Sequence, residues 1–147
     1  MEFADIGVST SPPETRIVAE TQISARFDVI TWEESALDDS HDLPKIAWAT
    51  WTSVYWGEMQ GESTTQWLVA YAADGSTHYV GLERFRGAAA GRDGSMVIQH
   101  VGTYANSTVK GSLTVVVGSG TDGLASASGE GTFFAHRGGS VRLSLQF

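Results

Sequence analysis

The sequence predicts an all-β protein, an eight-stranded antiparallel β-barrel with a central cavity. Its 147 residues include 17 glycines but only three prolines, and Val, Thr, Trp and Tyr are frequent, which favours strands joined by tight turns. Apolar and polar residues alternate within segments that end at turn signals, as they do in half-buried strands. Eight such strands can close into a barrel, which removes both sheet edges and encloses room for one small ligand. An open sandwich is the alternative arrangement.

The first four strands are expected at residues 21–32, 46–61, 62–73 and 77–90. Apolar residues alternate with polar ones from Ile23 to Val29, which is typical of a strand with one buried face. Residues 33–45 hold five acidic residues and a proline, so we expect a solvated loop there. The next two strands are rich in aromatic residues. Asp74-Gly75, flanked by strand-like sequence on both sides, signals a hairpin.

The last four strands are separated by clusters of Gly, Asn, Asp and Ser. These clusters predict a tight turn at residues 91–94, connections at 105–107 and 118–123, and a last turn at 138–139. The strands themselves are expected at residues 95–104, 109–117, 125–136 and 140–147.

The chain is long enough for one globular domain and leaves little room for a second. We assign residues 20–147 to a single barrel domain. Residues 1–19 contain a polar stretch with the pair Pro12-Pro13 and are predicted to form a flexible N-terminal arm.

Composition excludes several classes of partner. The formal net charge is −8 and the nine Lys and Arg residues are scattered, so we expect neither nucleic acid nor a membrane surface as partner. No apolar run approaches the roughly 20 residues that cross a bilayer, and residues 1–11 carry two acids and no base, unlike a signal peptide. The absence of cysteine excludes thiolate chemistry and fits a cytoplasmic protein. The expected partner is a small apolar molecule, neutral or weakly charged.

Several motif matches do not predict a site. Residues 118–123 have the spacing of a dinucleotide-binding loop, but the residues that follow lack helical periodicity and an acid at the required distance. Asn106-Ser107-Thr108 fits a glycosylation sequon and is interpreted as a turn. There is no G-x-S-x-G elbow, and the four histidines lack the i, i+4 spacing of metal ligands, so we expect no metal and no other cofactor. The histidines are His41, His78, His100 and His136.

A two-residue turn at Asp74-Gly75 would pair Ala73 with Ser76 and fix the two faces of that hairpin. One face mixes small, aromatic and polar groups, as a ligand-binding lumen does. It consists of Glu62, Thr64, Gln66, Leu68, Ala70, Tyr79, Gly81, Glu83 and Phe85. The other face is bulkier and more apolar, and if it points outward a subunit interface would cover it. It consists of Trp67, Val69, Tyr71, His78, Val80, Leu82 and Arg84. We therefore expect a homo-oligomer, a dimer or larger; the alternative is that the two faces are reversed.

A second tight turn at residues 91–94 would place Phe85 opposite His100. Glu83 and His100 would then share a face as near-diagonal neighbours, close enough for direct or water-mediated contact. A carboxylate and an imidazole in a partly apolar lumen are candidates for shifted pKa values and proton transfer. In the same register Glu83 faces Gln66, and the alternative is that these two form a satisfied buried pair that holds the barrel.

Three ordered motifs resemble a known family. They lie at residues 79–84 (YVGLER), 91–100 (GRDGSMVIQH) and 116–121 (VVGSGT). In this order they resemble a bacterial family of unknown function whose members adopt an allene-oxide-cyclase-like barrel, related to dirigent and polyketide-cyclase barrels. The resemblance covers most of residues 21–147 and implies an eight-stranded barrel with a central cavity, often assembled into oligomers. It implies neither one reaction nor a set of catalytic residues. Met96 departs from the pattern, because the family usually has an aromatic residue at that position.

The sequence favours a cofactor-independent cyclase or isomerase that acts on an apolar, polyketide-like natural-product intermediate inside the lumen. Glu83 and His100 would be the catalytic residues, while the lumen holds the substrate in a reactive shape. The substrate-binding residues would be Trp48, Trp51, Trp56, Gln66, Tyr79, Phe85, Met96 and Gln99. One alternative is a non-catalytic carrier or sensor of a hydrophobic ligand, and another is an interaction module whose lumen is filled by side chains.

Overall fold

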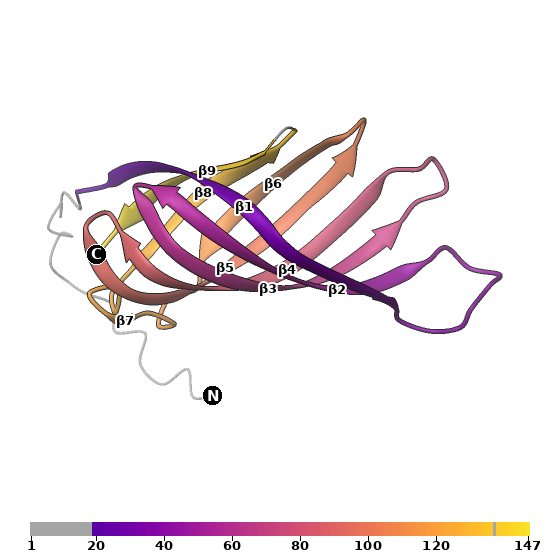
Figure 1. Ribbon diagram of the computed structural model, residues 1–147, viewed down its shortest axis with the longest axis horizontal. Coiled ribbons are helices and arrows are strands. Elements are labelled where there is room, and N and C mark those ends of the chain that lie inside the picture. Colours follow the sequence, from indigo (N-terminus) through magenta and orange to yellow (C-terminus); the bar gives the residue numbers. More distant parts are fainter. Residues whose placement is uncertain (1–18, 137) are drawn as a thin grey trace, which may run out of the picture.

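A computed structural model describes residues 19–136 and 138–147, which form strands and turns (Figure 1). The strands are β1 (Thr21–Ala36), β2 (Ile46–Gly57), β3 (Met59–Tyr71), β4 (Thr77–Ala89), β5 (Arg92–Ala105), β6 (Thr108–Val115), β7 (Thr121–Asp122), β8 (Ser128–Ala135) and β9 (Gly139–Gln146). The arm expected at residues 1–19 lies outside the described residues except for its last residue. Within the described part of the chain, no helix is long and apolar enough to cross a lipid bilayer.

The sheet closes on itself. Strands pair antiparallel in the order β4-β3-β2-β1-β9-β8-β6-β5, and a further pairing of β4 with β5 completes the ring. All eight strands of the ring therefore have partners on both sides, as a barrel requires. This confirms the predicted eight-stranded antiparallel barrel.

The ninth strand, β7, lies in the connection between β6 and β8 and pairs with the start of β5. The pairing of β5 with β6 ends at Ile98 and Val115, so the first residues of β5 need other partners. The Ser119 hydroxyl accepts a hydrogen bond from the Val97 N–H at 2.9 Å, and the Thr121 hydroxyl accepts one from the Ser95 N–H at 3.0 Å. Ser119 and Thr121 of the Gly-Ser-Gly-Thr motif thus supply partners for the first residues of β5, which is a structural role for this motif.

A β-bulge in β1 changes which side chains of that strand point inward. Val29 pairs with Ser53 but Thr31 pairs with Thr52, so Ile30 is an extra residue. Before the bulge Ile23, Ala25 and Phe27 are buried, and after it the even-numbered Trp32 lines the pocket inside the barrel. Bulges commonly re-aim side chains in this way. The bulge also accompanies an extension of β1 to Ala36, four residues into the segment predicted as a loop.

The barrel has one solid half and one hollow half. Hairpins β2–β3 and β4–β5, the β6–β8 connection and the C-terminus lie at the solid end, and the other four hairpins lie at the open end (Figure 1). The solid half is a core of aliphatic, Met and Phe side chains closed by Leu124 and Ala127 from the β6–β8 connection. Its fully buried members include Met59, Phe85, Ala89, Met96, Ile98, Leu113 and Leu145.

The β3–β4 hairpin differs from its predicted register by one residue. The Ala72 N–H donates to the Ser76 carbonyl at 2.8 Å, which leaves a three-residue turn of residues 73–75 with Gly75 at φ +87°. Glu83 consequently pairs with Thr65, and the predicted pairing with Gln66 is wrong. The faces of β3 are therefore the reverse of those predicted: Gln66 and Leu68 point outward, while Trp67 and Val69 point inward. For this strand the alternative, in which the two faces are reversed, is correct.

The turn between β4 and β5 also lies elsewhere than predicted. It consists of Ala90-Gly91, both at positive φ, because Ala89 pairs with Arg92. Likewise the β2–β3 turn lies at Gly57-Glu58 rather than after Gly61. The β4–β5 shift is an even number of residues, so His100 shares a face with Glu83 as predicted, and the burial of Tyr79, Glu83 and Phe85 confirms the predicted inward face of β4. The exposed outer face carries Trp48, Leu68, Val80, Leu82 and Val101, and the expected oligomer stays a prediction.

We expect Gly61→Ala to lower the free energy of unfolding by about 3 kcal/mol. Gly61 pairs with Gly87 where β3 and β4 bend, at φ +152°, and an added Cβ would lie 2.2 Å from the Arg86 carbonyl oxygen. Gly118→Ala is the control, because Gly118 has φ +87° but no atom within 4 Å of its Cβ position, so it should cost about 1 kcal/mol. Urea unfolding followed by tryptophan fluorescence measures both. Equal losses would show that the close approach contributes nothing.

Candidate functional site

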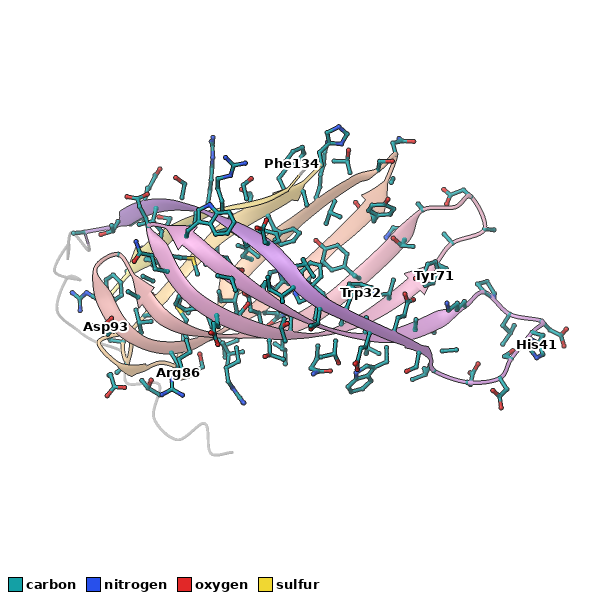
Figure 2. The ribbon with its side chains drawn as sticks, viewed as in Figure 1. Trp32, His41, Tyr71, Arg86, Asp93 and Phe134 are labelled. Carbon is teal, nitrogen blue, oxygen red and sulfur yellow. The ribbon has the colours of Figure 1, made fainter. Side chains whose placement is uncertain are left out.

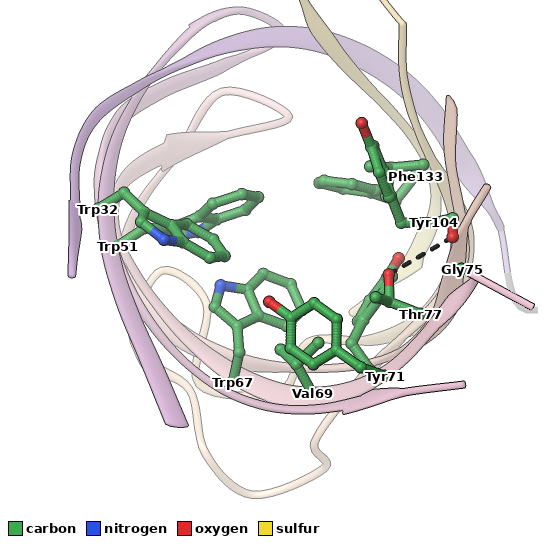
Figure 3. Close-up of a pocket in the computed structure, with 11 residues that line it drawn as sticks. Trp32, Trp51, Trp67, Val69, Tyr71, Gly75, Thr77, Tyr104 and Phe133 are labelled. Carbon is green, nitrogen blue, oxygen red and sulfur yellow. Dashed lines mark hydrogen bonds between the residues drawn. The ribbon is translucent and has the colours of Figure 1, made fainter. Parts of the chain in front are cut away.

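A pocket of about 400 Å³ occupies the hollow half of the barrel and opens between the hairpins at that end (Figure 3). Aromatic side chains from β1, β2, β3, β4, β5 and β8 project into it from opposite walls (Figure 3). Trp32 and Tyr71 lie in the half of the barrel that carries the β1–β2 and β3–β4 hairpins (Figure 2). The volume falls in the range of small-molecule sites. The lining residues are Trp32, Trp51, Trp67, Val69, Tyr71, Gly75, Thr77, Tyr79, Tyr104, Val109 and Phe133.

Glycines in the wall make room for two aromatic residues, Trp67 of β3 and Tyr79 of β4. A Cβ on Gly81 would lie 2.4 Å from the Trp67 ring. A Cβ on Gly102 or Gly111 would lie 2.2 Å from the Tyr79 hydroxyl oxygen. Trp67 and Tyr79 can therefore lie against the sheet, with their rings edge to face at 5.0 Å, and leave the centre of the pocket open.

The floor of the pocket is a layer of aromatic rings across the barrel. The rings of Trp51 and Trp67 meet edge to face at 4.8 Å, and Phe133 lies 6.2 Å from Trp51. Phe27 stacks on Phe133 at 5.0 Å from the solid side. This layer separates the pocket from the packed core.

Glu83 and His100 lie beneath this layer. Glu83 is 2% exposed and His100 1% exposed, and the imidazole Nε2 is 2.7 Å from Glu83 Oε1. The Tyr55 hydroxyl donates to Glu83 Oε2 at 2.5 Å. The His100 ring contacts Trp67 at 4.9 Å and Phe133 at 5.5 Å, so two floor residues cover it. The predicted diagonal contact of Glu83 with His100 is present, although neither residue lines the pocket.

Burial alone would raise the pKa of the Glu83 carboxyl, because it penalises the charged form. The hydrogen bond and charge of His100, with the hydroxyls of Ser63 and Tyr55, outweigh burial and hold that pKa below its ordinary value. Burial and the adjacent Glu83 carboxylate raise the pKa of Tyr55 well above 10, so the phenol remains a donor. The cluster is therefore an ionised carboxylate held between two donors.

One polar atom of the cluster has no protein partner. His100 Nδ1 is buried and makes no hydrogen bond to the described residues, and the same holds for Tyr79 Oη and Trp67 Nε1 in the pocket wall. Buried polar atoms without partners are rare in folded proteins and mark places where a ligand or water can bind. Burial also raises the pKa of Tyr79 to about 12, which keeps this phenol neutral.

A polar cluster lies at the rim of the pocket. The Tyr71 hydroxyl donates to Glu34 Oε1, and Lys45 Nζ lies 3.7 Å from the same oxygen. Lys45 Nζ is also 4.9 Å from the centroid of the Tyr71 ring. The hydrogen bond to Glu34 is the main cause that raises the pKa of Tyr71 to about 12. These contacts link β1 and β3 with the residue that precedes β2.

The structure separates the predicted substrate-binding residues into three groups. Trp51 and Tyr79 line the pocket as expected. Phe85 and Met96 point inward but are fully buried in the solid core, so they do not line a cavity. Trp48, Trp56, Gln66 and Gln99 lie on the outer face, where Trp48 is 48% exposed and Trp56 45% exposed, and the expectation that they face the lumen is wrong. Their strand positions alternate with the buried ones, which fixes them outside.

The sequence analysis missed most of the pocket. Trp67, Val69 and Tyr71 were assigned to the other face because of the one-residue slip, although their strong apolar alternation was a usable signal. Trp32 and Glu34 were missed because no local pattern marks the β1 bulge. Phe133 and Tyr104 lie in strands that were predicted, but the predicted strand pairings were not used to decide whether their side chains point inward. Within the described residues, no group of three or more His, Asp or Glu side chains is placed to hold a metal ion.

Comparison with known proteins places the chain in a family. The family model described as a protein of unknown function (DUF3224) matches residues 23–147. The chain belongs to the DUF3224 family. A crystal structure of a DUF3224 protein with unknown function from Shewanella oneidensis MR-1 is similar, with a TM-score of 0.75 and 28% identity over 88% of this chain and 98% of that chain. No curated protein matches this DUF3224 chain. Membership of a bacterial family of unknown function was thus predicted correctly, and the allene-oxide-cyclase-like relationship stays a prediction.

We expect Glu83→Gln to lower the free energy of unfolding by about 2 to 4 kcal/mol at pH 7, because it weakens the charge-assisted hydrogen bonds to His100 and Tyr55. The pKa of Glu83 is lowered in the folded state, so its stabilising contribution is present above the ordinary carboxyl pKa and is lost as the pH falls through the folded pKa. The difference between wild type and variant should therefore shrink as the pH falls from about 6 to about 3. Urea titrations across this range measure it. A constant difference, equal to that of the exposed control Glu62→Gln, would contradict the assignment.

Proposed function

We propose that the barrel binds a small apolar molecule in its open half, as a carrier or sensor. The observation that carries this proposal is the pocket of about 400 Å³ whose walls are almost entirely aromatic and aliphatic. Apolar walls that converge on an open space favour an apolar occupant, because ligand and wall both lose contact with water. A flat ring system can also stack on the rings of the floor.

The position of Glu83 and His100 favours binding over catalysis. A catalytic acid or base must come within about 2.6–3.2 Å of the proton that it transfers, or reach it through one water. Neither Glu83 nor His100 lines the pocket, and Trp67 and Phe133, which do line it, lie against the His100 ring. The contact of Glu83 with His100 is therefore suited to fix β4 against β5 and to support the floor. The buried pair of Glu83 with Gln66 that was the alternative is not formed, because Gln66 points outward.

The second candidate function is a cofactor-independent cyclase or isomerase that acts on an apolar natural-product intermediate. The unpartnered Nδ1 of His100 favours it, because a buried imidazole with one nitrogen on a carboxylate and the other free has the arrangement of a general base. Displacement of the Trp67 ring would connect this nitrogen to the pocket. The substrate would then lie on Trp51 and Phe133, with its acidic carbon toward His100.

We expect Val109→Trp to weaken the binding of a neutral aromatic probe, naphthalene, at least tenfold. Val109 lies in the pocket wall and is partly exposed, so an indole there fills the space without overpacking the core. Val101→Trp is the matched control, because Val101 lies on the outer face and is 49% exposed. Quenching of tryptophan fluorescence or calorimetry gives the dissociation constants. Equal affinity in the two variants would place the site elsewhere, and no binding to wild type would refute the proposed function.

The enzymatic candidate has its own test. The protein is purified from its host, any retained small molecule is identified by native mass spectrometry, and that molecule is incubated with fresh protein. A carrier returns the molecule unchanged, whereas an isomerase converts it. If conversion occurs, Glu83→Gln should abolish it at a temperature at which circular dichroism shows the variant folded, while Glu62→Gln should not. Conversion that survives Glu83→Gln removes this pair from the mechanism.

A further inference from the structure

Two of the four hairpins around the mouth of the pocket are strongly acidic. Residues 33–45 and 72–76, which form two of the hairpins around the mouth, hold six carboxylates and one ammonium, that of Lys45. The whole chain has a formal net charge of −8. Charge of one sign around an opening raises the local concentration of ligands of the opposite sign and repels those of the same sign. An anionic ligand would therefore meet a barrier at this mouth.

The chain itself shows how the rim holds a positive charge. The Lys45 ammonium lies between the face of the Tyr71 ring, 4.9 Å from its centroid, and the Glu34 carboxylate, 3.7 Å from Oε1. Tyr71 lines the pocket. Glu34 lies on β1, two residues after Trp32 and therefore closer to the tip of the β1–β2 hairpin. An exposed pair of this kind is weak, and the Lys45 side chain is 53% exposed, so another cation can replace it at small cost.

The walls inside the rim suit the same kind of ligand. Seven aromatic side chains line the pocket, and the described residues that line it include no Lys, Arg or His. The faces of Trp and Tyr rings attract ammonium groups, most strongly where water is excluded. Trp32 and Tyr104 are partly exposed at the mouth, while Trp51, Trp67 and Phe133 lie at the floor. The mouth of the pocket thus combines charged and aromatic side chains, whereas its floor is apolar.

We infer that the ligand is an amphipathic organic cation, with an aromatic or aliphatic body on the floor and a quaternary or tertiary ammonium at the mouth among Trp32, Tyr71 and Glu34. This inference rests on the proposed function, because it assigns a chemical class to the occupant of the same pocket. The ammonium takes the place of the Lys45 ammonium beside the Glu34 carboxylate. The body displaces water from the aromatic walls.

Three probes of one shape and different charge test the inference. They are phenyltrimethylammonium, the neutral isostere tert-butylbenzene and the anion benzenesulfonate. We expect the cation to bind the wild-type chain roughly tenfold more tightly than the neutral isostere, and the anion to bind at least tenfold more weakly than the cation. Calorimetry in low salt gives the three dissociation constants. If the neutral and the cationic probe bind with equal affinity, or if the anion binds more tightly than the cation, the inference is wrong. The proposal that the pocket binds apolar molecules would not be affected by that result.

Two substitutions assign the charge to the rim. Glu34→Gln should weaken phenyltrimethylammonium at least fivefold and leave tert-butylbenzene within twofold, whereas Glu62→Gln, which changes the net charge equally on the outer face, should alter neither. Lys45→Met should strengthen the cation severalfold, because it removes the competing ammonium from Glu34. If Glu34→Gln and Glu62→Gln act alike, or if Val109→Trp leaves cation binding intact, the inference is wrong. If neither the cation, tert-butylbenzene nor naphthalene binds, the proposed function itself fails.

Discussion

The aromatic layer formed by Trp51, Trp67 and Phe133 is the constraint on which the rest of the structure depends. It divides the barrel into a solid half, which supplies the core, and a hollow half, which holds the pocket. Interiors of eight-stranded barrels are just wide enough for side chains to fill them, so a cavity needs a device that keeps side chains to the walls. Here the small residues Gly81 and Gly102 provide it, because they let rings lie flat against the sheet.

The buried polar cluster supports this layer from below. Glu83 joins β4 to the Tyr55 hydroxyl of β2 and to the His100 imidazole of β5, and the His100 ring in turn supports Trp67 and Phe133. A carboxylate in the core is tolerated because its oxygens receive hydrogen bonds. The same geometry explains why His100 is close to the pocket without lining it. Structural support and proximity to the pocket therefore come from one cluster.

The sequence predicted the fold well because its signals are local. Alternation and turn residues located eight strands. Closure was one of two arrangements that these strands allowed, and it depends on the long-range pairing of β1 with β9. The contact of Glu83 with His100 was also found, since the predicted partner of His100, Phe85, lies four residues from the observed partner, Gly81, and an even error keeps the face. The three-residue turn before β4 produced an odd error, so Gln66 was wrongly predicted to point inward and Trp67 to point outward. The bulge at Ile30 has no local signature, so Trp32 was not predicted to line the pocket.

We propose that the space above the aromatic layer is a binding site and that this layer separates the polar cluster from the ligand. A crystal soaked with 1-bromonaphthalene tests both points, because the anomalous signal of bromine locates the ligand without reference to the protein density. We expect one bromine site inside the barrel mouth, over Trp51, Trp67 and Phe133. Bromine only on the outer face near Leu82, or below the layer in contact with the Glu83 carboxylate, would contradict it.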